Sequence, residues 1–383
     1  MRPKITQDHK QSIVFITLHA KEIFHQLRWP NGVTCPYCGE KHIWTYRSGT
    51  YKCSHCHKTF SDTSNTVFNS TKVPLAYWII AMYLDSMAKG ISSEELASFL
   101  QVTQKTTWYI LHKIRTKLSL DGTLLNGDIA VDEVYLRGKW SSVIVPKKIE
   151  FMKRQGLYYP DDKERTWSKH NVQLAISAYK QPVFGMNDGD NIVLRALPNN
   201  FDSQDLVQLI EQHTDNVSHL VSDQSSLYTE MMNRYNVVQM NHSKREFRNG
   251  DYSSNRIEGT FSHIKRRVRC HYVRPDKKYI QLYLNEFCFR WNHRDEQTMT
   301  RLTHMMRLCC SGGRVTNKDI DNYTWLDSFH QRRPKHHESI DDWLDKPWPG
   351  LVNQIKINGV IYDRDDYKRL KLIREAGLEK LLD

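Results

Sequence analysis

Apolar residues recur at helical spacing through the first third of the chain. Residues 11–28 form one such pattern, which ends at the turn-forming run 29–32. After a Ser/Thr/Asn-rich link at 61–71, the pattern predicts three further helices over 75–88, 91–100 and 103–118. A serine begins the second of these, and Thr103 is the expected N-cap of the third. The last two helices, joined by a short turn, have the layout of a helix-turn-helix.

From residue 127 the pattern changes to alternating strands and helices. Strands are predicted at 127–136, 172–179, 192–197, 219–223 and 236–240, and helices at 203–213, 225–235, 253–269 and 278–293. This order predicts an α/β, RNase H-like domain over 126–296, a mixed sheet flanked by helices. The basic stretch 137–169 is expected to be a loop or insertion. The charged tail 314–383, with a strand-like piece at 355–362 and a terminal helix, is an extension without an assigned role.

The helix predicted at 253–269 is clearly amphipathic. Glu258 and Lys265, seven residues apart, share one face of it. We interpret it as a helix that presents a metal ligand beside a phosphate backbone. The plain alternative is a solvated basic face on which Asn255 and Glu258 form a capping box. The apolar stripe of this helix consists of Ile257, Phe261, Ile264 and Val268. Its further cations are Arg256, Arg266, Arg267 and Arg269.

The chain is strongly basic. Its 383 residues are 39% hydrophobic, which supports folded cores, and they carry a net charge of +12. Such an excess of positive charge favours a protein that binds a polyanion, of which nucleic acid is the first candidate. The alternative is a soluble protein that is basic without such a partner. No run approaches the roughly 20 apolar residues of a membrane span, and the N-terminus lacks a signal-peptide core. We expect no membrane partner and a cytoplasmic location, nucleoid-associated in a bacterial host or nuclear in a eukaryotic one.

Four of the 8 cysteines form two C-x2-C pairs, Cys35 with Cys38 and Cys53 with Cys56. This spacing predicts a tetrahedral, structural zinc site in a zinc ribbon over 31–61, after an N-terminal helix in 1–30. The alternative is a set of reduced thiols without metal. Between the pairs, the strand-favouring residues Trp44, Tyr46 and Tyr51 predict a hairpin. Three nearby histidines are possible alternative ligands, but a set of four cysteines does not need them: His42, His55 and His57.

The helix-turn-helix domain, expected over 72–120, offers candidate DNA contacts. Gln104, Lys105 and Thr107 lie at the start of its second helix, where a recognition helix contacts bases. The cations Lys113, Arg115 and Lys117 lie further along the same helix. The alternative is an ordinary helical hairpin.

Three acids are placed to meet in the predicted sheet. Asp132 and Asp223 end the first and fourth strands, which are neighbours in an RNase H-like sheet, and Glu258 lies on the helix that follows. Three such carboxylates can hold two divalent cations, Mg²⁺ or Mn²⁺, on which phosphoryl transfer can be catalysed. Glu133 is a rival for the first acid, and alternation along the strand puts it on the opposite face from Asp132.

Several motifs resemble those of the DDE transposases of the Merlin type and their bacterial insertion-sequence relatives. They are VDEVYLRGK, VSDQSSLY, NRIEGTFSHIKRRVR and YLNEFCFRWNHR, and the resemblance covers about residues 30–295. It implies that Asp132, Asp223 and Glu258 are the three acids, which favours Asp132 over Glu133. It also implies that Lys265 contacts DNA. Because some relatives have asparagine as the third ligand, Asn255 remains the second choice for that position.

The resemblance implies a transposase that binds the terminal inverted repeats of its element as a homodimer or higher multimer. It would cleave 3′ ends with two Mg²⁺ (or Mn²⁺) ions per site and join them to target DNA. Arg266 and Arg269 complete the expected DNA contacts beside Lys265. Two other functions fit the same sequence: a catalytically silent DNA-binding regulator and an RNase H-like nuclease or resolvase.

Overall fold

The computed structural model describes residues 6–87, 89–119, 121–136, 145–154, 175, 179–240, 248–249, 252–253, 255–270, 272, 275–325, 354–357 and 360–363. The chain divides into two compact units, Met1–Leu326 and Asp327–Asp383. In the second unit, β11 (Gln354–Ile357) and β12 (Val360–Asp363) form an antiparallel hairpin where the strand-like piece was predicted. The predicted terminal helix lies outside the described residues.

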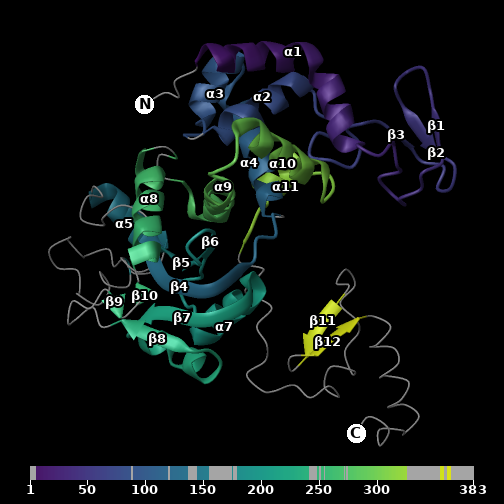
Figure 1. Cartoon of the computed structure of the whole chain (residues 1–383). Coiled ribbons are helices and arrows are strands. Elements are labelled where there is room, and N and C mark those ends of the chain that lie inside the picture. Colours follow the sequence, from purple (N-terminus) through teal and green to yellow (C-terminus); the bar gives the residue numbers. More distant parts are fainter. Residues whose placement is uncertain are drawn as a thin grey trace, which may run out of the picture. The chain divides into compact units, whose positions relative to one another are not determined.

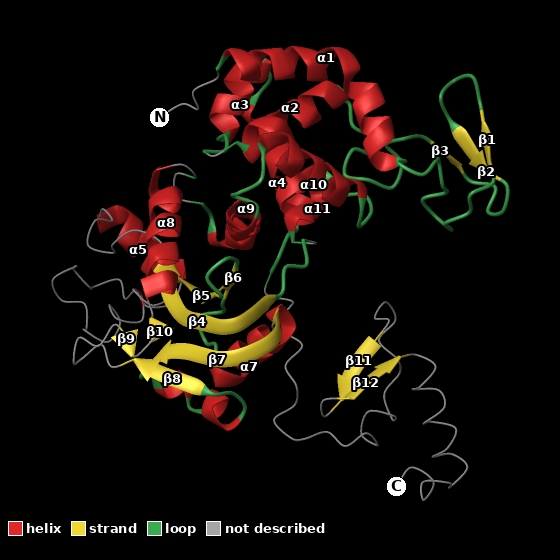
Figure 2. Cartoon of the chain, viewed as in Figure 1, coloured by secondary structure: helices red, strands yellow, loops and turns green. Residues whose placement is uncertain are grey.

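The N-terminal helices share one hydrophobic core (Figure 2). It is formed by four helices that the sequence pattern predicted: α1 (Gln7–Arg28), α2 (Leu75–Ser86), α3 (Ser93–Leu100) and α4 (Gln104–Leu118). Ser92 and Glu95 form a capping box at α3, and Thr103 caps α4. A fifth helix, α10 (Thr298–Cys310), returns from the far end of the unit to join this core, which the sequence pattern did not predict. α11 (Asn317–Asp321) follows it.

The cysteine-rich segment folds into a small three-stranded antiparallel sheet. It comprises β1 (Ile43–Thr45), β2 (Tyr51–Cys53) and β3 (Thr59–Phe60). The hairpin predicted between the two cysteine pairs is the β1–β2 pair.

The central sheet has the strand order β6-β5-β4-β7-β8 (Figure 1). Its strands are β4 (Leu125–Leu136), β5 (Gln181–Asn187), β6 (Ile192–Ala196), β7 (Thr214–Asp223) and β8 (Val237–Met240). β5 pairs antiparallel with β4 and β6, whereas β7 pairs parallel with β4 and β8. The sheet is therefore mixed, and its first and fourth strands are neighbours, which confirms the predicted fold class.

The predicted position of the second strand was wrong. The strand is Gln181–Asn187, and the two described residues within 172–179, Ala175 and Tyr179, are helical. Alternating apolar residues favoured the earlier segment. The true strand contains Pro182 and Gly185, which ordinarily weaken a strand prediction.

Helices cover the sheet. α8 (Asn255–Cys270) packs on β4 and β5, α9 (Ile280–Asn292) packs on β6, and α7 (Ser203–His213) packs on β7. The predicted helix at 225–235 is instead two short 3₁₀ turns, η3 (Ser226–Tyr228) and η4 (Glu230–Asn233). Tyr228 is buried and its hydroxyl donates to Glu133, so a contact from the sheet fixes this segment.

The described part of the basic insertion is helical. Residues Val145–Arg154 form α5, and the rest of 137–169 lies outside the described residues. Lys147 and Lys153 are exposed, whereas Lys148 is buried. The short elements β9 (Arg248–Asn249), β10 (Tyr252–Ser253) and η6 (Lys277–Tyr279) precede α8 and α9. Among the described residues, no helix is long and apolar enough to cross a membrane.

Candidate active site

The register of β4 and β7 places Asp132 beside Asp223. Ala130 pairs with Val221 in the parallel register, and each aspartate lies two residues further along its strand. Side chains two residues apart face the same side of a sheet. The pair Ala130 and Val221 shares a core with Ile257 of α8. Both aspartates therefore lie on the side of the sheet that α8 covers.

The α8 helix is held close to the sheet by its apolar face and by a glycine. The four residues of the predicted stripe are all buried, as expected: Ile257, Phe261, Ile264 and Val268. Gly185 pairs with Asp132, and a Cβ at Gly185 would lie 2.5 Å from the Phe261 ring and 2.9 Å from Ile257. The buried Asn187 adds a polar tie, because its amide donates to Thr260 Oγ1 at 2.9 Å.

The polar face of α8 presents Glu258, half-buried, and the exposed Lys265 and Arg266. Asn255 is the first helical residue, so it does not occupy the N-cap position that the capping-box alternative requires. Arg267 points elsewhere: its Nε donates to the Tyr272 hydroxyl at 3.0 Å and its Nη2 to the Lys89 carbonyl at 2.9 Å. The side chain of Arg269 lies outside the described residues.

The three acids do not lie close enough together in this structure to form one group of metal ligands. Among the described residues, the groups of three or more potential ligands within 4.8 Å of one another are the four cysteines and a second set of two histidines and a glutamate. Asp132, Asp223 and Glu258 do not form such a group. The fold thus brings two acids together on adjacent strands and places the third on the covering helix.

Negative charge is concentrated at this end of the sheet. Glu133 accepts a hydrogen bond from the Tyr228 hydroxyl at 2.7 Å. Burial raises the pKa of Glu133 to about 7; this hydrogen bond lowers it, and the carboxylates of Asp132 and Asp223 raise it further. Because strand alternation turns it away from α8, Glu133 faces the opposite side from Asp132.

The start of α4 presents only part of the predicted DNA-contacting surface. Gln104 and Lys105 are exposed. Thr107 is fully buried, and its hydroxyl donates to the Ser93 carbonyl at 2.7 Å. The prediction that Thr107 contacts DNA was therefore wrong, because this side chain holds α3 against α4.

The four predicted zinc ligands converge. Sγ of Cys35 lies 3.5 Å from Sγ of Cys56, and Sγ of Cys38 lies 3.5 Å from Sγ of Cys53. Tetrahedral zinc with bonds of about 2.3 Å separates its sulfur ligands by about 3.8 Å. The distances and the four-sulfur donor set fit a structural zinc ion, as the sequence predicted.

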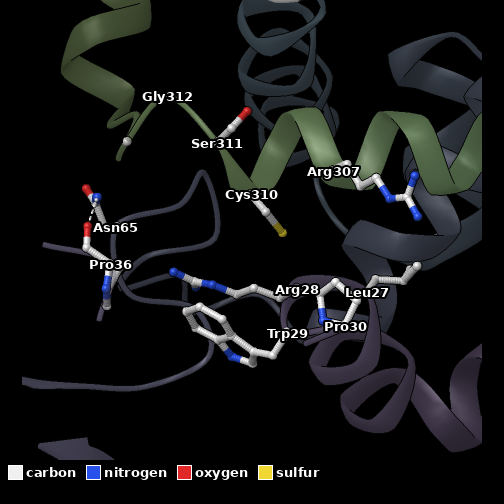
Figure 3. Close-up of a pocket in the computed structure, with 11 residues that line it drawn as sticks. Leu27, Arg28, Trp29, Pro30, Pro36, Asn65, Arg307, Cys310, Ser311 and Gly312 are labelled. Atoms are coloured by element: carbon white, nitrogen blue, oxygen red, sulfur yellow. Dashed lines mark hydrogen bonds between the residues drawn. The ribbon is translucent and has the colours of Figure 1, made fainter. Parts of the chain in front are cut away.

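A pocket lies between the end of α1, the zinc ribbon and the end of α10 (Figure 3). The Arg28 guanidinium lies 4.4 Å from the Trp29 ring centroid and donates to the Ser64 carbonyl. Asn65 donates to the Pro36 carbonyl at 3.0 Å, from the ribbon side. No sequence pattern indicates this pocket, because its lining comes from stretches far apart in the chain.

The second ligand group, His293, Glu296 and His304, was not predicted from the sequence. It spans the end of α9, the turn after it and α10, and its spacing matches no common zinc motif. Only the return of α10 toward α9 brings these residues together.

Comparisons with known proteins agree with the predicted resemblance. Residues 18–59 match the transposase zinc-ribbon domain, and residues 124–292 match the ISXO2-like transposase domain. Over 122 residues the chain is 30% identical to an uncharacterized protein in the transposable element ISH50 of Halobacterium salinarum. That alignment covers 31% of this chain and 41% of the other protein.

Among solved structures, a chain of a pre-cleavage Mos1 transpososome aligns with 60% of this chain and 78% of its own length. The sequence identity is 11% and the TM-score 0.19, a value too low to establish a common fold.

Proposed function

We propose that this chain, which carries the zinc-ribbon and ISXO2-like domains of insertion-sequence transposases, is a DDE transposase. It binds the terminal inverted repeats of its element, hydrolyses the 3′ ends and joins the freed 3′-hydroxyls to target DNA. One observation supports the proposal: Ala130 pairs with Val221 on the side covered by α8, and Asp132 and Asp223 each follow two residues later on their strands, while α8 carries Glu258.

The three acids are the proposed ligands of two Mg²⁺ or Mn²⁺ ions. Carboxylate oxygens are the donors these hard cations prefer. The pKa of Glu133 is raised first by burial and then by the nearby carboxylates of Asp132 and Asp223, so uncompensated negative charge does gather at this end of the sheet. Such ions, when bound, stabilise the attacking and leaving oxygens of an in-line displacement. The protein contributes by fixing two acids on adjacent strands and the third on a packed helix.

DNA binding is assigned to two separated surfaces. Lys265 and Arg266 are exposed on α8 about two turns after Glu258. Together with Arg269 they would contact the phosphates of the cleaved strand. Gln104 and Lys105, at the exposed start of α4, would contact the terminal repeat together with the zinc ribbon. The net charge of +12 supports a polyanionic partner, and we expect a homodimer or higher multimer on DNA.

A cleavage and strand-transfer assay on oligonucleotides that carry the inverted repeats flanking the gene tests this proposal. Asp132→Ala, Asp223→Ala and Glu258→Ala should each abolish Mg²⁺-dependent cleavage while end binding is kept, because binding rests on residues elsewhere. Asn255→Ala is the matched control on the same helix. If Asn255→Ala loses cleavage and Glu258→Ala does not, the third ligand is Asn255.

The same assay separates the two other functions. A silent regulator would bind the repeats and cleave nothing under any metal condition. A plain nuclease would cleave DNA without the repeats and would join no ends. The presence of all three acids argues against the first, and the zinc-ribbon and helix-turn-helix elements argue against the second.

A further inference from the structure

We propose that His293, Glu296 and His304 form a second transition-metal site, of the class that binds Zn²⁺, separate from both the zinc ribbon and the carboxylate site. Its ligand atoms come from the C-cap of α9, the turn that follows, and α10. The metal would join the end of a helix that packs on the central sheet to a helix of the N-terminal core.

The ligand atoms have the spacing of a metal site. Nδ1 of His293 lies 2.8 Å from Glu296 Oε1, and Nδ1 of His304 lies 3.4 Å from both His293 Nδ1 and Glu296 Oε2. Tetrahedral zinc with bonds of about 2.0–2.1 Å to nitrogen and oxygen separates its ligands by about 3.3 Å. The three side chains are 16–35% exposed, which leaves room for a water as the fourth ligand.

The second nitrogen of His293 has the partner that metal-bound histidines usually have. Its Nε2 lies 3.1 Å from Oδ1 of Asp121, in the segment between α4 and β4. A carboxylate on the far nitrogen fixes the ring and directs the lone pair of the near nitrogen to the metal. Asp121 is thus a positioning residue, and β4, which it precedes, carries Asp132.

The turn that carries two of the ligands is preorganised. The guanidinium of the buried Arg301 donates from Nη1 to the carbonyl oxygens of His293, Arg294 and Glu296, at 3.2, 3.1 and 2.8 Å. Its Nε donates to the Ser86 carbonyl in the helical core at 2.8 Å. The backbone around the ligands therefore does not depend on the metal for its shape.

Hydrogen bonds partner both ring nitrogens of His293 but leave part of this group unsatisfied. Oε2 of Glu296 is buried without a hydrogen bond among the described residues, although it faces His304. The two Nδ1 atoms face each other, so they cannot both carry a hydrogen there. A cation between them would use both nitrogen lone pairs and this carboxylate oxygen.

The test uses the full chain purified with its zinc ribbon loaded. Elemental analysis of the zinc-saturated protein should find two zinc ions per chain in the parent, one in Cys35→Ser and one in His304→Ala. His19→Ala, which removes an exposed histidine of α1, should keep two. Co²⁺ added at the second site should give weak visible bands without the near-ultraviolet thiolate bands of a cysteine site.

Two milder variants guard against misfolding as the explanation. Calorimetric titration of Zn²⁺ should show at least 10-fold weaker binding for Glu296→Gln, which keeps the shape of the side chain. Asp121→Asn should weaken binding by about 10–100-fold, the usual effect of removing such a partner. A parent protein that binds only the cysteine-held zinc, or variants that bind the second ion as the parent does, would overturn the proposal.

Discussion

The helices α4 and α8 are both amphipathic and basic in sequence, yet the fold buries two cations near the end of α4 and exposes two cations of α8. On α4, Arg115 and Lys117 are 3% and 4% exposed. On α8, Lys265 and Arg266 are exposed. A row of cations on a helix therefore does not show which helix faces a polyanion, because the partners of those cations lie far away in sequence.

The buried cations of α4 have specific partners. Arg115 Nε donates to Glu286 Oε2 on α9 at 2.6 Å, and the Tyr272 hydroxyl donates to Oε1 of the same carboxylate at 2.8 Å. Lys117 Nζ donates to the carbonyl oxygens of Gly312 and Gly313 at 2.6 and 2.8 Å. These contacts fasten α4 to later parts of the chain, so its C-terminal half is structural.

Arg115→Ala should have the largest effect on stability. The change leaves the fully buried Glu286 without its closest cation, and breaking a buried pair costs about 3–5 kcal/mol. Urea unfolding followed by circular dichroism measures it. The matched control is Arg266→Ala, an exposed cation of α8, which should change stability by less than about 0.5 kcal/mol. If Arg115→Ala stays stable but loses DNA binding, the contrast between the two helices fails.

Gly185→Ala should have the next largest effect, because it disturbs the buried face of α8. Its Cβ would meet the Phe261 ring at 2.5 Å, and overpacking of this kind costs about 1–3 kcal/mol. The displaced helix would carry Glu258 away from the aspartates, so cleavage should fall more than end binding. Phe261→Leu in the same chain should restore part of both. If Gly185→Ala alone is as active as the parent, the close approach of α8 is not required.

Two carboxylates of the fold also differ in their surroundings. Glu286 faces cations, whereas Glu133 has acidic neighbours and a pKa raised to about 7. The folded protein therefore binds a proton on Glu133 more tightly than the unfolded chain does. This contribution to stability is full below about pH 4.5 and is lost as the pH rises through 7, with a size of about 1–2 kcal/mol after allowance for partial exposure.

Glu133→Gln removes this titration and should flatten the fall in stability between pH 5 and 7, measured by urea unfolding without added divalent ions. Mg²⁺ should raise the stability of the parent at pH 7.5, if the acids bind it, and Asp132→Ala should lose that gain. A variant with the same pH slope as the parent would show that Glu133 does not titrate in this range.

The sequence predicted what depends on local pattern and on strand order. The helix stripe at Ile257 and Phe261, the cap at Thr103 and the convergence of the cysteines all follow from spacing. The second strand was misplaced because its Gly185 weakens a strand prediction. The reason for this glycine is the close packing of α8, which lies far along the chain. The burial of Thr107 and Arg115 and the meeting of His293 with His304 also depend on tertiary contacts, which spacing does not encode.

The smallest expected effect concerns Lys265, and it tests the exposed side of α8 directly. Lys265 lies two turns from Glu258 on an exposed face, so it would reach a phosphate held at the acids. Lys265→Ala should weaken DNA binding about equally for all sequences, and the slope of log binding constant against log salt should fall by roughly one. Cleavage should also decrease, and Lys265→Arg should keep part of it, because the charge remains.

Lys21→Ala, which removes an exposed lysine of α1, is the matched control and should leave both the salt slope and cleavage unchanged. The other possible role of Lys265 is that of an ordinary solvated cation, whose surface pairing is worth about 0–1 kcal/mol. A Lys265→Ala protein with the salt slope and strand transfer of the parent would assign it that role. The functional difference between α4 and α8 would then rest on Arg266 and Arg269 alone.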